Sequence, residues 1–131
     1  MESELSVVCE EIARRVKNGG VVILRGDLAS GKTTLTRAFA TYLNLDDEVT
    51  SPTFSLQQCY GEKLFHYDIY NKGVEHFLEL GMLEELDRDG YHLVEWGDEK
   101  LIEILKKVQI PTIIVDITKQ DTKREYKITN A

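Results

Sequence analysis

The chain has 131 residues, of which 42% are hydrophobic and 30% charged, and 16 basic against 23 acidic residues leave a formal net charge of −7. A chain of this length and composition is typical of one globular domain, so we expect residues 1–131 to form a single domain. The acidic balance and the absence of a long Lys/Arg run argue against a surface that binds nucleic acid directly. We find no bilayer-length apolar run and no secretory pattern, so we expect a cytoplasmic protein without a membrane partner.

Hydrophobic periodicity predicts alternating helices and strands along the chain. In the first half we expect a helix up to Gly19-Gly20, a strand at 21–25, a helix at 33–43 and a hairpin of strands at 54–59 and 64–70. In the second half we expect a helix from Val74 that is interrupted near Gly81 and that Gly90 ends. We then expect a strand at 91–96, a helix at 101–108, and strands at 112–117 and 125–128 flanking a polar turn. This order predicts an α/β fold with a mostly parallel sheet, an antiparallel hairpin and helices on both faces.

Residues 26–33 read Gly-Asp-Leu-Ala-Ser-Gly-Lys-Thr, a full match to the phosphate-binding pattern G-x-x-x-x-G-K-[ST]. A strand pattern precedes these residues and a helix pattern follows them, which is the context that this loop requires. In such a loop, backbone N–H groups and a helix N-terminus converge on phosphate groups. We therefore expect a P-loop NTPase-like fold that binds a nucleoside triphosphate, with Lys32 on the β- and γ-phosphates and the Thr33 hydroxyl on Mg²⁺.

Hydrolysis also needs a carboxylate near the metal and a group that orients water. Glu95 ends a predicted strand, and the C-terminal ends of strands in an open α/β sheet face the ligand crevice, so Glu95 is the candidate metal ligand. Asp68 ends another strand pattern and is the candidate for organising the attacking water or a metal-bound water, with a turn or capping aspartate as the alternative.

Several other residues have both a functional and a structural interpretation. Thr53 stands where a switch-like threonine meets the γ-phosphate, or is a strand-surface threonine. Trp96 either supports the site or packs in the core. His66 and His92 lie in strand patterns, which favours packing residues over catalysts. Cys9 lies on the apolar face of a helix, which predicts a buried free thiol.

Taken together, these segments resemble the bacterial TsaE (YjeE) family. The matching segments are Gly26–Thr34, Ser51-Pro52-Thr53-Phe54, His66-Tyr67-Asp68-Ile69-Tyr70, Leu78-Glu79-Leu80-Gly81 and Leu93-Val94-Glu95-Trp96. The segments occur in the family's order and extend over most of the chain. Each is weak alone except the first, and their combination is specific.

The resemblance implies a small Mg²⁺-dependent ATPase that serves the threonylcarbamoyl modification of adenosine in tRNA. It implies that the nucleotide is held by Leu28, Ala29, Ser30, Gly31, Lys32, Thr33 and Thr34. It further implies that Thr33 and Glu95 bind Mg²⁺, and that hydrolysis needs Asp68 together with Lys32 and Glu95. Trp96 would support the site. Arg124, in the predicted turn before the last strand, aligns with a family arginine near the nucleotide base, although an exposed lone arginine is the alternative.

The resemblance also implies a protein partner, the TsaB–TsaD pair, which ATP hydrolysis resets between turnovers. tRNA would be reached only through that complex. Two positions depart from the family pattern. Ala29 stands where the family usually has glycine, and Thr50 replaces a usual lysine before Ser51.

Three other functions remain open from the residues alone. Thr118-Lys119-Gln120-Asp121 matches the guanine-reading pattern [NT]-K-x-D, and Asp87-Arg88-Asp89-Gly90 contains D-x-x-G, so a GTPase switch is one alternative. The D-x-x-G match follows a helix pattern instead of a strand, which weakens that alternative. A small-molecule kinase is a second, although the chain has few arginines and no lid-length insertion. A binding module gated by ATP is the third.

Overall fold

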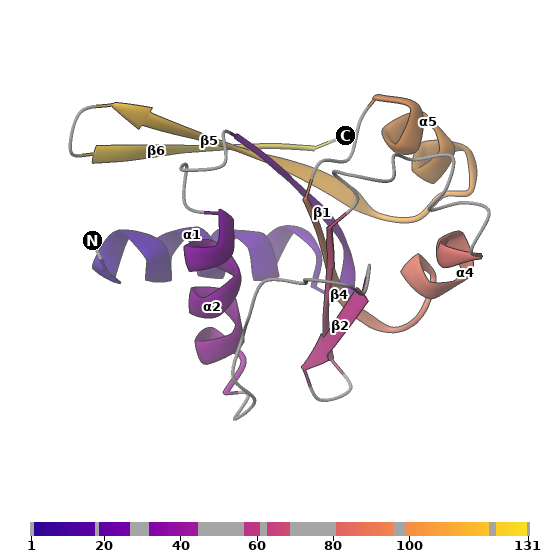
Figure 1. The fold of residues 1–131 in the computed structure, drawn as a ribbon, viewed down its shortest axis with the longest axis horizontal. Helices are drawn as coiled ribbons and strands as arrows, with labels where there is room; N and C mark the ends of the chain where they lie inside the picture. Colours follow the sequence, from indigo (N-terminus) through magenta and orange to yellow (C-terminus); the bar gives the residue numbers. More distant parts are fainter. Residues whose placement is uncertain are drawn as a thin grey trace.

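The computed structural model describes residues 2–17, 19–26, 32–44, 57–60, 63–68, 81–95, 99–120 and 123–130. The first elements are α1 (Glu2–Arg15), β1 (Gly19–Arg25), α2 (Lys32–Tyr42), β2 (Gln57–Tyr60) and β3 (Leu64–Asp68). They are followed by α4 (Met82–Leu86), β4 (Gly90–Glu95), α5 (Glu99–Lys107), β5 (Thr112–Gln120) and β6 (Lys123–Asn130) (Figure 1).

The described strands form a 6-stranded sheet in the order β2-β3-β4-β1-β5-β6. The four inner strands, β3, β4, β1 and β5, pair in parallel. The outer strands β2 and β6 pair antiparallel with β3 and β5. The predicted mostly parallel α/β sheet is thus confirmed, and it carries an antiparallel pair at each edge where we expected one hairpin.

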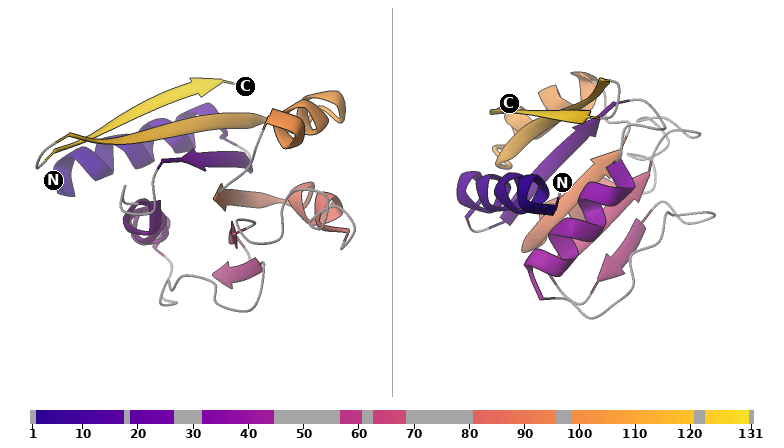
Figure 2. Two further views of the ribbon diagram at one scale, coloured as in Figure 1. Left: turned by 45° about the horizontal axis from the view of Figure 1, so that its top comes forward. Right: turned by 90° about the vertical axis from the view of Figure 1, so that its left-hand side faces the viewer.

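The helices cover both faces of the sheet, which the sequence also predicts (Figure 2). Side chains from α1 and α2 pack with Val22 and Leu24 of β1 in one hydrophobic core. Side chains from α4 and α5 pack with Val21 and Ile23 of the same strand in a second core. Because successive side chains of a strand point to opposite faces, β1 feeds both cores, which explains its continuous apolar run.

Gly90 has a different role from the predicted one. We expected it to end a helix, but α4 ends at Leu86 and Gly90 begins β4. Its backbone has φ +123°, and a Cβ atom there would lie 2.8 Å from the carbonyl oxygen of Lys63. That same carbonyl accepts a hydrogen bond from the N–H of Tyr91 at 2.7 Å. The close approach of the chain entering β3 therefore requires a residue without a side chain at the start of β4.

The last two strands are longer than predicted. The polar residues that we assigned to a turn continue the ladder, with Thr118 opposite Glu125, Lys119 opposite Arg124, and Gln120 opposite Lys123. Backbone hydrogen bonds do not depend on side-chain polarity, so a polar run extends an exposed hairpin as well as an apolar run does.

The remaining differences are small or lie outside the described residues. β1 starts at Gly19, two residues before the apolar run, and β2 is described from Gln57. Of the predicted elements, the strand residues 54–56 and 69–70 and the helical segment 74–80 lie outside the described residues. None of the described helices is long and apolar enough to cross a membrane.

Candidate functional site

The predicted acidic residues lie on adjacent strands, at the edge of the sheet formed by the C-terminal ends of β1, β3 and β4. Glu95, the last residue of β4, lies opposite Leu24 of β1 on one side and opposite Asp68, the last residue of β3, on the other. The chain continues from β1 through Gly26 into the glycine loop, and α2 begins at Lys32. The parallel register thus brings two carboxylate positions from separate motifs beside the strand that leads into the phosphate-binding pattern.

Glu95 is buried, with only 6% of its surface exposed. Its side chain lies on the same face of β4 as Leu93, which belongs to the core formed with α1 and α2. The carboxylate therefore faces the side of the sheet that α1 and α2 cover. Burying an ionised carboxylate has a high free-energy cost unless it is hydrogen-bonded, paired or bound to a metal, so this position indicates a specific partner.

One partner of Glu95 is His66 of β3. The Nε2 atom of His66 contacts Oε2 of Glu95, and the His66 side chain is fully buried. Because a carboxylate only accepts, Nε2–H is the donor. The other ring nitrogen, Nδ1, is buried and has no hydrogen-bond partner among the described residues. We expected His66 to be a packing residue, and its contact with Glu95 is the feature of this site that sequence reasoning missed.

The donor atoms of this edge fit a magnesium ion. Mg²⁺ takes oxygen ligands and is commonly held by one or two carboxylates together with substrate phosphates and water. Glu95 supplies one such carboxylate at the end of β4. Among the described residues, no group of three or more His, Cys, Asp and Glu side chains forms a complete metal cage.

An exposed ion pair lies at the same edge. Arg25, the last residue of β1, contacts Oε1 of Glu99 through Nη2, and Glu99 is the first residue of α5. The pair connects the end of the central strand to the helix that follows β4. Because Glu99 is 76% exposed, solvent screens the interaction and we assign it a small share of the stability.

A second buried histidine, His92, lies on the opposite face of β4 and has both ring nitrogens bonded. Its Nε2–H donates to the carbonyl of Arg88 at 2.8 Å, so its Nδ1 accepts from the Tyr67 hydroxyl at 2.7 Å. The His92 ring stacks on the Phe65 ring, with centroids 4.7 Å apart. The guanidinium carbon of Arg88 lies over the Phe65 ring, 5.0 Å from its centroid. Burial lowers the pKa of His92. This histidine is the packing residue that we predicted.

Cys9 also agrees with its prediction. It is a free cysteine with no exposed surface, in the core between α1, α2 and the sheet. Desolvation raises the pKa of its thiol to about 11. An un-ionised buried thiol is a weak nucleophile, so Cys9 serves as a small apolar side chain.

The other predicted site residues are described only in part or not at all. Leu28, Ala29, Ser30, Gly31, Thr50, Thr53 and Trp96 lie outside the described residues. For Lys32, Thr33 and Thr34, the first residues of α2, and for Asp68 and Arg124, the structure gives the backbone position alone. Arg124 corrects one expectation, because it lies within β6 opposite Lys119 and not in a turn.

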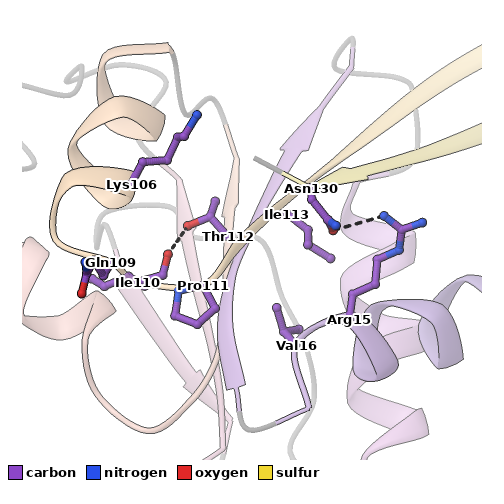
Figure 3. A pocket seen from close by; sticks show the side chains of 9 residues that line it. All are labelled: Arg15, Val16, Lys106, Gln109, Ile110, Pro111, Thr112, Ile113 and Asn130. Atoms are coloured by element: carbon purple, nitrogen blue, oxygen red, sulfur yellow. Dashed lines mark hydrogen bonds between the residues drawn. The ribbon is translucent and has the colours of Figure 1, made fainter.

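A cavity of about 420 Å³ lies at the opposite end of the parallel strands, where β5 begins (Figure 3). Arg15 and Val16 line it from the end of α1, Lys106 lines it from the end of α5, and Pro111 and Thr112 line it where β5 begins. None of the predicted site residues lines this cavity. The candidate site is therefore the edge at which the parallel strands end.

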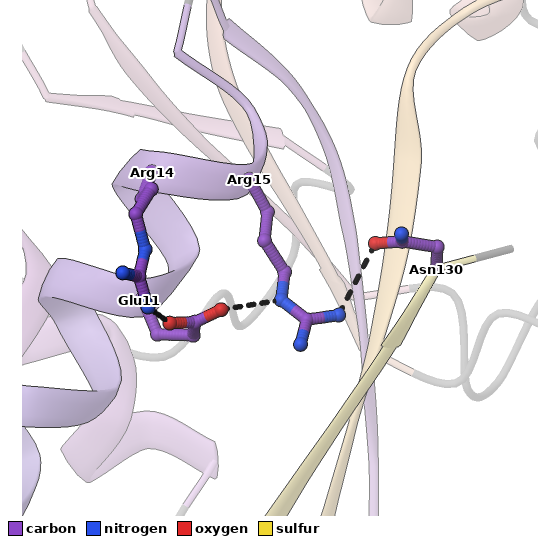
Figure 4. Close-up of polar contacts among 4 residues, drawn as sticks. All are labelled: Glu11, Arg14, Arg15 and Asn130. Atoms are coloured by element: carbon purple, nitrogen blue, oxygen red, sulfur yellow. Dashed lines mark hydrogen bonds and ion pairs between the residues drawn. The ribbon is translucent and has the colours of Figure 1, made fainter.

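Arg15, which lines this cavity, already has polar partners (Figure 4). Glu11 accepts from Arg14 and from Nε of Arg15, the latter at 2.6 Å. Arg15 also donates to Oδ1 of Asn130 at 3.2 Å, which joins the end of α1 to the last strand. These contacts indicate a structural role for this edge of the sheet.

The parallel order β3-β4-β1-β5, the glycine loop between β1 and α2, and a buried carboxylate on the neighbouring strand define a P-loop NTPase-like α/β protein. The model of a family described as "Threonylcarbamoyl adenosine biosynthesis protein TsaE" matches residues 1–127. The chain belongs to the TsaE family.

Individual relatives agree with this assignment. The tRNA threonylcarbamoyladenosine biosynthesis protein TsaE of Rickettsia bellii is 34% identical over 137 aligned residues, which cover 98% of this chain and 90% of that protein. The protein of the same name from Treponema pallidum is 35% identical over 96 residues, or 71% of each chain. The crystal structure of Bacillus subtilis YdiB matches with a TM-score of 0.62 and 29% identity, covering 100% of this chain and 80% of that chain.

Proposed function

We propose that this protein is a Mg²⁺-dependent ATPase that serves the biosynthesis of threonylcarbamoyladenosine in tRNA by acting on the TsaB–TsaD complex. The observation that carries the proposal is the register of β3, β4 and β1. It aligns Asp68 and Glu95 beside the strand that leads into Gly-Asp-Leu-Ala-Ser-Gly-Lys-Thr. The names of the relatives support the pathway, and the glycine loop supports the nucleotide.

The nucleotide would be held mainly through its phosphates. Backbone N–H groups of residues 28–34 and the N-terminus of α2 would bind the phosphate oxygens, with the Lys32 ammonium on the β- and γ-phosphates. Thr33 and Glu95 would bind Mg²⁺, which neutralises the charge that develops on the phosphate oxygens. The burial of Glu95 supports this role, since a desolvated carboxylate interacts more strongly with a cation than an exposed one does.

Asp68 would orient the water that attacks the γ-phosphate. Its position at the end of β3, opposite Glu95, supports a place next to the metal carboxylate. Thr53 would contact the γ-phosphate, Trp96 would support the site from the residue after Glu95, and Arg124 would lie near the base. Arg124 lies near the start of β6, where the β5–β6 ladder extends beyond the last residue of β1, which is compatible with that role.

The protein partner in this proposal is the TsaB–TsaD pair, with tRNA reached only through the complex. The net charge of −7 supports an indirect route, because a protein that grips tRNA itself usually carries an excess of basic residues. Cycles of ATP binding and hydrolysis would reset the pair between turnovers in the cytoplasm.

The test is ATP hydrolysis measured with and without purified TsaB–TsaD, with Lys32→Ala as the inactive control and EDTA as the metal-free control. We expect stimulation by the pair that disappears with Lys32→Ala and with EDTA. Hydrolysis that the pair does not change would contradict the coupling, and phosphate transfer to a small acceptor would favour a kinase.

The GTPase alternative is disfavoured by the fold. Thr118 and Lys119 continue β5 and pair with β6, so they do not form a loop after the strand as a guanine-reading motif would. The D-x-x-G match follows α4 and not a strand. We therefore expect excess GTP to compete poorly with ATP in the hydrolysis assay.

A further inference from the structure

We propose that His66 is a positioning residue for the metal site: its Nε2–H holds the Glu95 carboxylate in the orientation that binds the metal. The inference rests on the proposed function, because it concerns the residue that we assign to Mg²⁺. It adds a residue to which the glycine-loop pattern and the predicted acidic residues gave no role.

The placement of the two side chains carries the first step of the argument. His66 lies opposite Leu93 on the neighbouring strand, so Glu95 is its diagonal neighbour two positions further along β4. Side chains at such positions lie on the same face of a sheet and are within reach of one another. The contact joins Nε2 of His66 to Oε2 of Glu95, inside the protein.

The second step concerns the freedom of the carboxylate. A glutamate side chain has several rotatable bonds, and a metal ligand must adopt one of its rotamers before the metal binds. A hydrogen bond to a charged acceptor is strong and directional, so a buried donor restricts Glu95 to fewer rotamers. Ligands of metal ions are commonly oriented in this way by a neighbouring hydrogen-bonding group, and loss of that group typically weakens metal binding about 10–100-fold.

The third step is the contrast with His92. That residue has both ring nitrogens bonded, as a histidine kept for packing and hydrogen bonding should. His66 is equally buried, yet its Nδ1 has no partner among the described residues. A buried ring nitrogen without a hydrogen-bond partner costs free energy. Its contact with Glu95 therefore gives a better reason for a histidine at position 66 than packing does.

The experiment measures metal affinity directly. Mn²⁺ binding is followed by electron paramagnetic resonance with a non-hydrolysable ATP analogue present, and analogue binding is measured separately in EDTA. His66→Gln keeps an N–H donor near the position of Nε2, and His66→Asn does not reach that position. We expect His66→Asn to weaken Mn²⁺ binding about 10–100-fold, His66→Gln to recover most of the affinity, and both to bind the analogue in EDTA as the wild type does.

A matched control separates positioning from stability. His92→Asn removes an equally buried histidine on the adjacent strand, and we expect it to lower the melting temperature without changing Mn²⁺ affinity. In the Glu95→Gln background, His66→Asn should have no further effect on Mn²⁺ binding, because His66 acts through Glu95. Circular dichroism verifies that each variant is folded.

Three outcomes would overturn the inference. They are wild-type Mn²⁺ affinity in His66→Asn, an equal loss of affinity in His92→Asn, and an undiminished effect of His66→Asn in the Glu95→Gln background. Failure of the proposed function gives a different result, because the wild-type protein would then bind neither the analogue nor Mn²⁺ with it.

Discussion

Among the residues that the structure describes, one fully buried histidine lies on each face of the sheet, and the two histidines have different surroundings. On the face covered by α4 and α5, both ring nitrogens of His92 are hydrogen-bonded, one to the Tyr67 hydroxyl and one to the Arg88 carbonyl. On the face covered by α1 and α2, His66 contacts Glu95 and has one nitrogen without a described partner. The two histidines are equally buried, and their different hydrogen-bond partners support different roles. We therefore assign a structural role to the network on the α4/α5 face and place the proposed metal site on the α1/α2 face.

The largest expected effects concern packing and should be similar on both faces. Leu35 and Leu105 are fully buried, one in each core. We expect Leu35→Ala and Leu105→Ala each to lower the free energy of unfolding by about 2–5 kcal/mol, because each removes apolar contacts and leaves a cavity. Chemical denaturation measures the change. A loss confined to one variant would mean that only one core stabilises the fold.

Glu95→Gln, on the α1/α2 face, should affect activity strongly and stability only slightly. We expect ATP hydrolysis to fall at least about 100-fold, since the amide lacks the charge that holds the metal. The free energy of unfolding should change by only about 1 kcal/mol, because glutamine has nearly the same shape and its amide oxygen still accepts from His66. Steady-state hydrolysis and denaturation on the same preparation check both parts. Hydrolysis at the wild-type rate would remove Glu95 from the metal site.

Tyr67→Phe, on the α4/α5 face, should lower stability and leave ATP hydrolysis nearly unchanged. It removes the donor to Nδ1 of His92 and leaves a buried acceptor without that bond. We expect a loss of about 1–3 kcal/mol in the free energy of unfolding and ATP hydrolysis within about twofold of the wild type. Stability unchanged by this substitution would show that the network on the α4/α5 face does not hold the strands together.

The smallest expected effect is on pH dependence. Burial holds the pKa of His92 below its ordinary value of 6.5, so this residue takes up a proton less readily in the folded protein than in the unfolded chain. Well above pH 6.5, His92 is neutral in both the folded and the unfolded chain, and it does not make the free energy of unfolding depend on pH. As the pH falls below 6.5, the unfolded chain takes up a proton first, and the free energy of unfolding decreases.

Denaturation curves between pH 7.5 and about 5.5 measure this slope, a range that lies above the ordinary pKa values of carboxyl groups. His92→Gln is the control, because it lacks the titrating group, and its stability should vary less with pH. An identical slope in the two proteins would assign the pH dependence to other residues.

Much of the fold follows from local patterns, for reasons seen in particular elements. The four apolar residues Val21–Leu24 predict a strand buried on both faces, and they lie at the centre of the sheet. The spacing of Cys9, Ile12 and Val16 predicts the buried face of α1. The ends of β5 and β6 could not be predicted in this way, because polar residues there are kept in the ladder by backbone hydrogen bonds alone.

The sequence by itself determined the glycine loop, the strand before it, the helix after it, and the candidate carboxylates at the ends of their strands. These features depend on residues close together in the chain. Only the tertiary structure decided that Asp68 lies opposite Glu95 and that His66 contacts the Glu95 carboxylate from 29 positions away. Hydrophobic periodicity gives the face of a strand that a residue occupies, but not which strand lies beside it or in which register. Those choices depend on the packing of the whole sheet between its two layers of helices.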